Sequence, residues 1–557
     1  MSKTETVHEN VVLDTSSPAE VNSGLNTRLS NWKEYQKIAF RIAFIFFVSI
    51  SIPNNAEWYD HVIHIDWTNL HYRDLYDIAR FGSGINFFGN KIFGSQLNGY
   101  ANWVITLLVS IGVGVIWTVV DRYRKPQPKE YNNLYYWLRA IVRYRAGIGI
   151  IGFGFTKLLP VQMPYPSVGL LNTNFGDLTA QKIYWLSIGI VPWYQVFAGV
   201  VEVLAGALLF FRGTTTFGAI LLFGALGDIV FVNFAYDGGV HVYSSYFVLL
   251  SGFLLVQDIP RLYNLLILER LTIPVNYYPS FSQKWQKYTR AAIKVGVFYV
   301  FLILLFYLQY VNFKYDPYKQ PSTKGVTALR GLYNVTEFKV NNQTIPYSPL
   351  DTVRWQQATF ENWTTLTFRV NKPTALDLSN GGGDPQRDIN RTFELTGVGG
   401  GQRAFHYYAD TVDHVLYLQD KYKAIPDRRN RVAGVGGDGG TEKNLNGGID
   451  KPLTEGASTE KASLDPNWIN PEAWKHIGDE VKMIDPKAAS TRRDREFATA
   501  KKSEKRNRMI LHYETTDGNR VILKGIDQYK DSIYVVLEKV NRSYALPSST
   551  LEAGKYK

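Results

Sequence analysis

The chain has no cysteine among its 557 residues. That absence excludes disulfides, thiolate metal sites, cysteine-ligated iron–sulfur clusters, covalently attached c-type haem and thiol redox relays. The sequence also lacks a Walker phosphate-binding loop, a nucleophile elbow and a zinc-protease signature. If redox chemistry occurs, the electrons must therefore come from a bound cofactor or from a partner protein.

Long apolar runs dominate the chain up to about residue 312, and polar residues dominate after it. The mean hydropathy of −0.15 averages over these two unlike parts. Aromatic residues make up 14% of the chain, and many lie at the ends of apolar runs, where amphipathic rings favour the membrane–water interface. A bilayer-spanning helix needs about 20 mainly apolar residues. We therefore expect about seven transmembrane helices, at 38–52, 103–120, 134–159, 193–211, 217–235, 242–256 and 292–310.

The formal net charge of +12 comes largely from cations that flank the apolar runs. With seven spans, these flanking cations all fall on one side, as the positive-inside rule requires. The pattern predicts a bacterial inner-membrane protein with a cytoplasmic tail at 1–37, a transmembrane domain at 38–312 and a periplasmic domain at 313–557. Cations in this arrangement indicate contacts with anionic membrane lipids, and we expect no nucleic-acid partner.

The C-terminal part alternates apolar and polar residues in short runs that are typical of β-strands. Between about 423 and 508, glycine-rich segments and a run of charges interrupt the pattern, which predicts a long flexible insertion. We expect an antiparallel β-barrel or β-sandwich. The expected strands are Leu332–Val340, Thr365–Val370, Arg391–Leu395, Arg403–Tyr408, His414–Gln419, Met509–Tyr513, Arg520–Lys524 and Ser532–Lys539.

Two stretches in the middle of the chain resemble DoxX-like membrane proteins. RYRAGIGIIGFGFTKLLPVQ (143–162) has an arginine, a glycine-spaced helix and a lysine at its end, and GVVEVLAGALLFFRGTTTFGAILL (199–222) resembles the hairpin that follows. The resemblance covers about 139–256, within an expected DoxX-like core at about 134–258. It implies a four-helix membrane unit, and some members of that family are described as subunits of quinone-linked oxidoreductases. GLYNVTEF (331–338) and RSYAL (542–546) weakly resemble the two ends of a lipocalin-type barrel.

Ionisable residues inside apolar spans are the strongest candidates for function, because an unpaired charge in hydrocarbon is costly. By helical rise, Arg145, Glu202 and Asp228 lie at similar depths near the middle of the membrane. Such a cluster could bind a quinone or a lipid headgroup, or carry protons. It could equally be an internal salt bridge that pins three helices together.

Two further groups lie near the outer ends of the spans. A polar cluster at the outer mouth is expected from Lys157, Asn233, Asp237 and His241, although turn formation alone accounts for part of that pattern. In the loop DHVIHIDWTNLH, His61 and His64 lie three residues apart and would share one helix face. That spacing allows a metal ion to bridge them, but histidines near a membrane are more often simply polar-tipped interfacial residues.

These observations lead to one leading function and two alternatives. The leading expectation is a DoxX-like protein that binds a quinone or a lipid headgroup in a redox-linked membrane process. The main alternative is a non-catalytic envelope component whose periplasmic β domain binds a protein partner or a ligand. A transporter is a third reading, because buried charge near the midplane also marks substrate sites in transporters.

Overall fold

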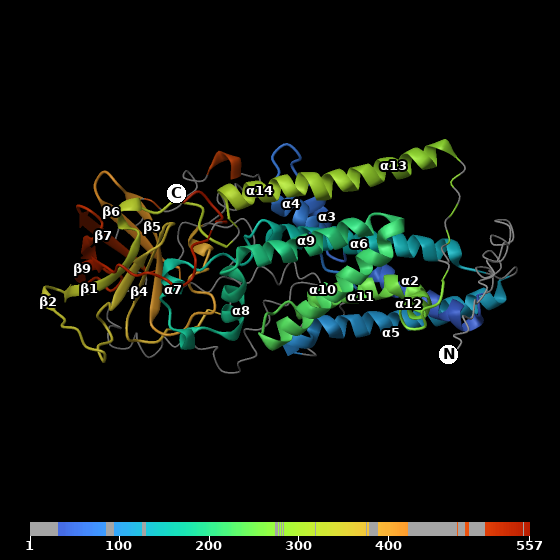
Figure 1. The fold of residues 1–557 in the computed structure, drawn as a ribbon, viewed down its shortest axis with the longest axis horizontal. Coiled ribbons are helices and arrows are strands. Elements are labelled where there is room, and N and C mark those ends of the chain that lie inside the picture. Colours follow the sequence, from blue (N-terminus) through green and yellow to red (C-terminus); the bar gives the residue numbers. More distant parts are fainter. Residues whose placement is uncertain are drawn as a thin grey trace, which may run out of the picture.

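The computed structural model is elongated, with long helices running along most of its length and a β-barrel at one end (Figure 1). The structure describes residues 32–84, 94–124, 130–272, 277, 279, 281, 283–317, 319–374, 376–377, 388–421, 476, 485–488, 507–549 and 551–556. The expected tail (1–37) lies almost entirely outside the described residues. So does nearly all of the expected insertion (423–508).

The helical part consists of long helices that lie side by side and of short helices between them (Figure 1). The last long helix is continuous through a π-helical segment, η5 (Tyr299–Leu304), between α13 and α14. The helices are α2 (Glu34–Ser49), α3 (Ala56–Ile63), α4 (Tyr72–Ala79), α5 (Gly94–Tyr123), α6 (Asn132–Leu158), α7 (Val168–Leu171), α8 (Ala180–Gly189), α9 (Pro192–Leu209), α10 (Thr215–Ala235), α11 (His241–Leu255), α12 (Ile259–Leu266), α13 (Lys284–Phe298) and α14 (Leu305–Tyr315).

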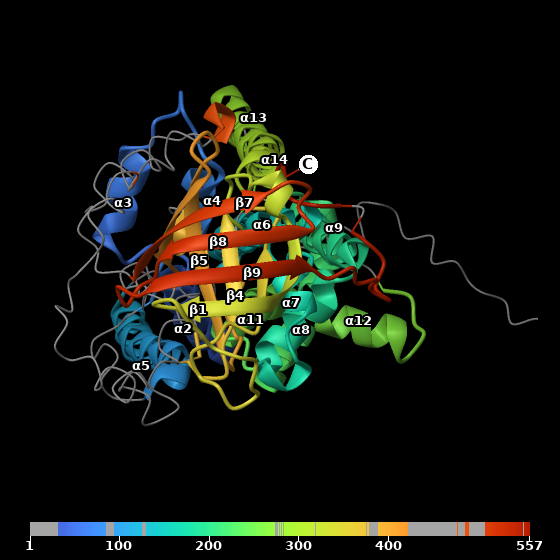
Figure 2. The same ribbon diagram turned by 90° about the vertical axis from the view of Figure 1, so that its left-hand side faces the viewer.

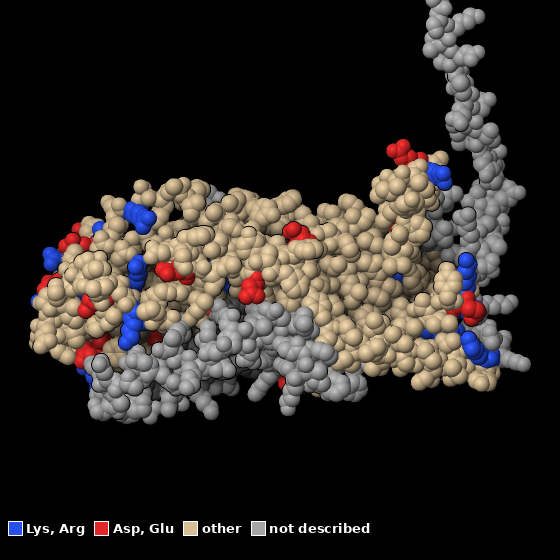
Figure 3. All heavy atoms as spheres, turned by 90° about the horizontal axis from the view of Figure 1, so that it is seen from below, with Lys and Arg blue, Asp and Glu red and all other residues tan. Residues whose placement is uncertain are grey.

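Five helical segments of the described residues are long and apolar enough to cross a membrane: Gly99–Tyr123, Pro192–Leu209, Arg212–Ala235, His241–Leu266 and Lys284–Tyr315. On the face that Figure 3 shows, few charged side chains lie over the long helices, and most of them gather toward the two ends of the molecule. The chain is therefore a membrane protein.

The expected count of seven spans is not confirmed. The runs at 38–52 and 134–159 do form helices, α2 and α6. However, α2 has only 16 residues, and α6 carries three arginines and a lysine.

Glycines bring α6 and α9 into close contact. A Cβ atom added at Gly199 would lie 2.3 Å from the backbone nitrogen of Leu158, and one at Gly154 would lie 2.9 Å from the backbone nitrogen of Val203. Helices in a membrane gain little from the hydrophobic effect when they associate, so they depend on close van der Waals packing. Small residues permit that packing because they let the two backbones approach. The glycine spacing that the sequence shows at 147–154 and 199–206 therefore positions α6 directly against α9.

The C-terminal strands form a closed antiparallel barrel, which Figure 2 shows with strands β7, β8 and β9 in front. Eight strands follow each other around it in chain order, and the last pairs with the first, as in Val335 opposite Leu537. Because the first and last strands pair, the domain is a barrel and not a sandwich. Its up-and-down strand order is that of lipocalin-like barrels in general form. The strands are β1 (Gly331–Val340), β3 (Gln357–Phe360), β4 (Thr365–Arg369), β5 (Gln402–Asp410), β6 (Val415–Asp420), β7 (Arg508–Thr515), β8 (Arg520–Ile526) and β9 (Ser532–Lys539), with the short β2 (Gln343–Thr344) beside β1.

The barrel interior is filled by side chains. Tyr333, Phe360, Phe405 and Leu511 are among the buried residues of one apolar cluster to which all eight strands contribute. Eight-stranded barrels have interiors that side chains can just fill. The barrel is thus a packed core, and its function must lie at its ends or on its outer face.

The expected strands are confirmed except for Arg391–Leu395, where that prediction is wrong. This segment forms turns after the short 3₁₀ helix at Asp388–Asn390. In this conformation Arg391 pairs with Asp316 and Glu394 pairs with Lys421, and these tertiary ion pairs override the local strand pattern. The sequence analysis also missed β3, which has only four residues and three of them buried, so that no alternation is visible.

The chain between α6 and α9 joins the helices to the barrel. This segment includes α7 and α8, and it lies against the end of the barrel that faces the helices (Figure 1). Leu178 forms an isolated β-bridge with Val398, and the backbone N–H of Thr179 donates to Gly397 O at 2.9 Å. The end of the chain returns to the same place, where the N–H of Gly554 donates to Phe313 O at 2.8 Å.

Candidate functional site

Arg145 lies buried in the helical part and faces the segment that follows α4. Its Nη1 donates to the carbonyl of Ala79 at 2.7 Å. The guanidinium carbon lies 4.1 Å from the ring centre of Phe81 and 5.1 Å from that of Tyr246. Within the described residues, Nε and Nη2 have no hydrogen-bond partner. A buried cation thus keeps two donors unused beside two aromatic rings.

Hydroxyl groups gather around the same arginine. The phenol of Tyr246 donates to Ile50 O at 2.7 Å, and Ser51 and Ser83 lie beside it. Neither serine hydroxyl forms a hydrogen bond of ordinary geometry in the described part of the chain, and both interact with the Tyr246 phenol. We call Arg145, Ser51, Ser83 and Tyr246 the Arg145 centre. Buried polar groups are nearly always paired, so this concentration of donors without an ordinary hydrogen bond is unusual.

Glu202 pairs with Lys157, and within the described residues no hydrogen bond or ion pair joins it to Arg145. The Lys157 ammonium donates to Glu202 Oε1 between α6 and α9, and both side chains are buried. The second oxygen, Oε2, has no partner among the described residues. The structure therefore combines one residue from each of two predicted clusters into a single ion pair.

Asp228 is exposed on α10, in an otherwise strongly apolar helix. It lies within electrostatic reach of the Tyr184 phenol, as does Glu202. No hydrogen bond or ion pair joins Asp228 to Arg145 in the described residues. Arg145, Glu202 and Asp228 were expected at one depth. Within the described residues, no hydrogen bond or ion pair joins any two of them.

The outer-mouth residues other than Lys157 shape the turn between α10 and α11. Asn233 Oδ1 accepts from the Val240 N–H at 3.4 Å, and Asp237 adopts a positive φ of 54° in the turn. The His241 ring stacks between Tyr100 and Phe234. Turn formation thus accounts for Asn233 and Asp237.

The two loop histidines have separate partners. His61 lies on α3 with its Nε2 3.2 Å from Asp74 O, and His64 follows α3 with its Nδ1 3.0 Å from Asp60 Oδ1. In the part of the chain that the structure describes, no group of three or more His, Asp or Glu side chains is arranged to hold a metal ion. A two-histidine metal site stays a prediction.

A network of buried charges connects the barrel to the helical part. Arg391 Nη2 lies 2.7 Å from Asp316 Oδ1, just beyond α14, and His71 Nε2 lies 3.5 Å from the other oxygen of Asp316. Within the barrel end, Lys421 Nζ lies 2.9 Å from Glu394 Oε2, and the Trp363 indole donates to Glu394 Oε1. Sequence reasoning missed this network because its members come from segments far apart in the chain.

Two members of the junction have strongly shifted pKa values. Burial lowers the pKa of Lys182 on α8 to about 7, although Glu394 and Asp377 oppose the shift, and its ammonium donates to Phe393 O at 2.6 Å. Burial, followed by repulsion from Glu394, raises the pKa of Glu361 to about 7. Perturbed groups of this kind occur both at functional sites and in structural networks.

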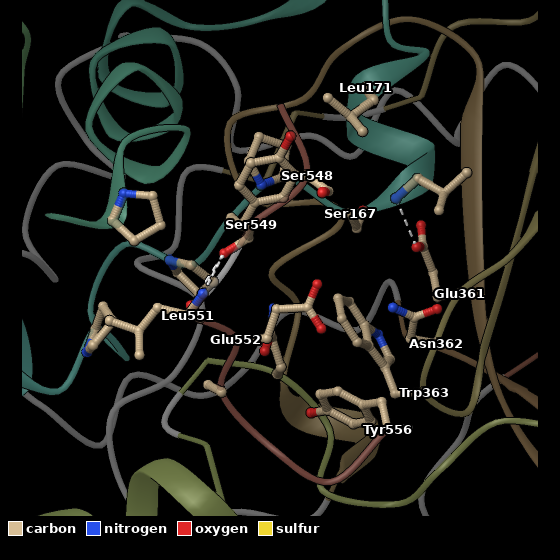
Figure 4. A pocket seen from close by; sticks show the side chains of 18 of the residues that line it. Ser167, Leu171, Glu361, Asn362, Trp363, Ser548, Ser549, Leu551, Glu552 and Tyr556 are labelled. Atoms are coloured by element: carbon tan, nitrogen blue, oxygen red, sulfur yellow. Dashed lines mark hydrogen bonds between the residues drawn. The ribbon is translucent and has the colours of Figure 1, made fainter. Parts of the chain in front are cut away.

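A cavity of about 410 Å³ lies at the same junction, between the helix ends, the barrel and the C-terminal tail (Figure 4). We call it the junction pocket. Glu361 lies at its edge, where its carboxylate accepts from the N–H groups of Val168 at 3.0 Å and Gly169 at 2.8 Å. The pocket lies within the size range of small-molecule sites, roughly 300–1,000 Å³.

No family model, curated protein or solved structure matches this chain. The geometry of its own residues must therefore carry the functional argument.

Proposed function

We propose that this protein binds the polar head of a membrane-soluble ligand, a quinone or a lipid, at the Arg145 centre, in a redox-linked membrane process. One observation carries the proposal: a buried guanidinium, with two nitrogens that form no hydrogen bond of ordinary geometry in the described residues, shares the Tyr246 phenol with the hydroxyls of Ser51 and Ser83. These donors suit an oxygen acceptor, either a quinone carbonyl or a lipid phosphoryl group. The nearby rings of Phe81 and Tyr246 suit a flat or apolar ligand.

Three features of the sequence bear on the electron source, the ligand and the membrane. The chain has no cysteine, so that no thiolate-bound centre can supply electrons. The resemblance to DoxX-like proteins favours a quinone, and the positions of the flanking cations favour a bacterial inner membrane with the barrel in the periplasm. In this proposal the N-terminus is cytoplasmic, and electrons reach the ligand from a bound cofactor or from another protein.

The test is to compare bound ligands in wild type and Arg145→Gln after gentle extraction from the native membrane. Native mass spectrometry and solvent extraction would measure quinone and lipid separately. Arg139→Gln is a matched control, because Arg139 also lies on α6 and donates to a backbone carbonyl, that of Leu254, at 2.7 Å. We expect Arg145→Gln to lose about ten-fold or more of the bound ligand, as loss of a charged hydrogen bond implies.

Loss of a quinone would support the redox reading, and loss of a phospholipid would support a lipid-binding role. Equal ligand content in the wild type and both variants, with the fold intact, would contradict the proposal. Glu202→Gln adds a check on the wider site. Since Glu202 pairs with Lys157, we expect that change to affect stability more than ligand content.

A non-catalytic envelope role for the barrel is the second candidate. The loop between β2 and β3 exposes three apolar side chains, with Tyr347 70%, Leu350 87% and Val353 53% exposed. Exposed apolar groups close together favour a protein contact. A partner retained in native mass spectrometry without any small molecule, and lost in Leu350→Ser, would favour this role over the first.

A further inference from the structure

The junction pocket has three walls that come from distant parts of the chain. The ends of the membrane helices contribute Pro160 and Pro192, the barrel contributes Glu361 and Trp363, and the C-terminal tail closes the remaining side. Tail contacts hold that side in place, since the Tyr165 phenol donates to Pro547 O at 2.7 Å. The pocket therefore exists only when the helices and the barrel are assembled.

The charged groups that line the pocket are of one sign. Glu361 and Glu552 are acidic, and no lysine or arginine is among the described residues that line it. Figure 4 shows Glu552 beside Trp363, with Tyr556 close to both and Glu361 farther along the wall. An anion entering this pocket would meet like charge without a compensating cation, so the lining disfavours anionic ligands.

Aromatic rings and apolar side chains form most of the remaining lining. The rings are those of Tyr165, Trp363, Tyr544 and Tyr556, and the apolar residues include Met163 and Leu551. Aromatic faces attract cations, and ammonium groups are commonly held by several rings together with carboxylates. The lining thus combines a site for an ammonium group with space for a hydrocarbon chain.

Glu361 adds a reason for a cationic ligand. Its side chain is fully buried and accepts hydrogen bonds from the backbone N–H groups of Val168 and Gly169. Because burial raises its pKa to about 7, a neighbouring ammonium would stabilise the charged carboxylate.

One lining residue of the pocket, Pro192, lies at the end of an apolar helix. Pro192 begins α9, and the next two residues, Trp193 and Tyr194, are 63% and 55% exposed. Exposed Trp and Tyr at the end of an apolar helix are typical of the membrane–water interface. The Pro192 side of the pocket is therefore the side that lies nearest to the membrane–water interface.

We propose that the junction pocket binds an amphiphile with an ammonium head, drawn from the membrane leaflet on the barrel side. The ammonium lies between Glu361, Glu552 and the aromatic rings, and the hydrocarbon chain lies against Met163 and Leu551. This site is separate from the Arg145 centre and has the opposite charge preference.

The experiment uses the full chain in a non-ionic detergent and three probes of equal chain length: decylamine, decanol and decanoate. Isothermal titration at pH 7.5 would measure each affinity. We expect decylammonium to bind about ten-fold more tightly than decanol, since a charge-assisted contact is worth about 1.4 kcal/mol or more. Decanoate should bind most weakly.

Glu552→Gln should weaken decylammonium binding about five- to ten-fold, while Glu538→Gln, on an exposed part of β9 away from the pocket, should leave it unchanged. Glu361→Gln tests the buried carboxylate, provided that this variant folds. Glu552 is exposed, so Glu552→Gln should fold and tests the proposal even if Glu361→Gln does not fold. Equal affinity for the three probes, or unchanged binding in every Gln variant that folds, would overturn the proposal. Arg145→Gln should leave decylammonium binding unchanged, so that the two proposed sites fail separately.

Discussion

Arg391 in the barrel domain forms a fully buried ion pair with Asp316, which directly follows the last membrane helix. The same guanidinium donates to the carbonyls of Pro317 at 3.0 Å and Gln320 at 2.9 Å. On its other side Asp316 faces His71, which precedes α4. One carboxylate therefore lies between the barrel and two separate parts of the helical domain.

We predict that Arg391→Ala lowers stability by about 3–5 kcal/mol, because it leaves Asp316 as a buried charge without its cation. The apparent Tm of the purified chain in detergent would measure the effect. Arg520→Ala, at the exposed start of β8, is the control. Equal Tm shifts in the two variants would show that the junction pair does not hold the domains together.

The Lys157–Glu202 pair should show strong coupling between its two members. We predict that Lys157→Met and Glu202→Gln each lower the apparent Tm, and that the double variant loses much less than the sum. A single change leaves a buried charge unpaired, whereas the double change removes both charges. A double-mutant cycle from thermal unfolding would check this, and strict additivity would argue against the buried pair.

Two glycines in membrane helices should respond in opposite ways to alanine. We predict that Gly199→Ala is destabilising, because its Cβ would meet the backbone of Leu158 at 2.3 Å, whereas nothing lies within 4 Å of a Cβ at Gly224. Gly224→Ala should be neutral or stabilising by up to about 1 kcal/mol, the difference in helix propensity. Thermal unfolding of the two variants side by side tests this. Similar losses in both would mean that α6 and α9 are not closely packed.

Stability should pass through a minimum near neutral pH because of two buried groups. Burial raises the pKa of Glu361 from its ordinary value of 4.5 to about 7. At pH values between these two, the folded state binds a proton that the unfolded state has lost, so stability falls as the pH rises through that range. Burial lowers the pKa of Lys182 from its ordinary value of 10.5 to about 7. At pH values between these two, the unfolded state binds a proton that the folded state has lost, so stability rises again as the pH rises through that range. The fall on the acidic side of the minimum and the rise on its alkaline side each amount to a few kcal/mol of unfolding free energy.

Apparent Tm values between pH 5 and 9 would test this minimum. Glu361→Gln should flatten the acidic limb, and Lys182→Met should flatten the alkaline limb, because each change removes one titrating group. Glu538→Gln, which is exposed on β9, should leave the profile unchanged. A wild-type profile without a minimum, or one that neither change alters, would contradict the burial of these charges.

The sequence by itself determined the membrane character of this protein and most of its local structure. Apolar run length identified the long helices, because that signal depends only on neighbours in the chain. For the same reason period-two alternation located seven of the eight barrel strands, but it missed the four-residue β3 and wrongly added Arg391–Leu395. The sequence also excluded disulfides and cysteine-ligated metal centres, because the chain has no cysteine. Helical rise placed Arg145, Glu202 and Asp228 at similar depths, but depth along a helix does not fix the direction in which a side chain points.

Only the tertiary structure decided which charges meet. The rotation of α6 against α9 pairs Glu202 with Lys157, and the rotation of α10 leaves Asp228 exposed. Pairing of β1 with β9 closes the barrel, which alternation alone cannot distinguish from a sandwich. The junction pocket depends on segments near residues 165, 361 and 552, and long-range packing of this kind leaves no periodic signal in the sequence, since each segment contributes only a few residues.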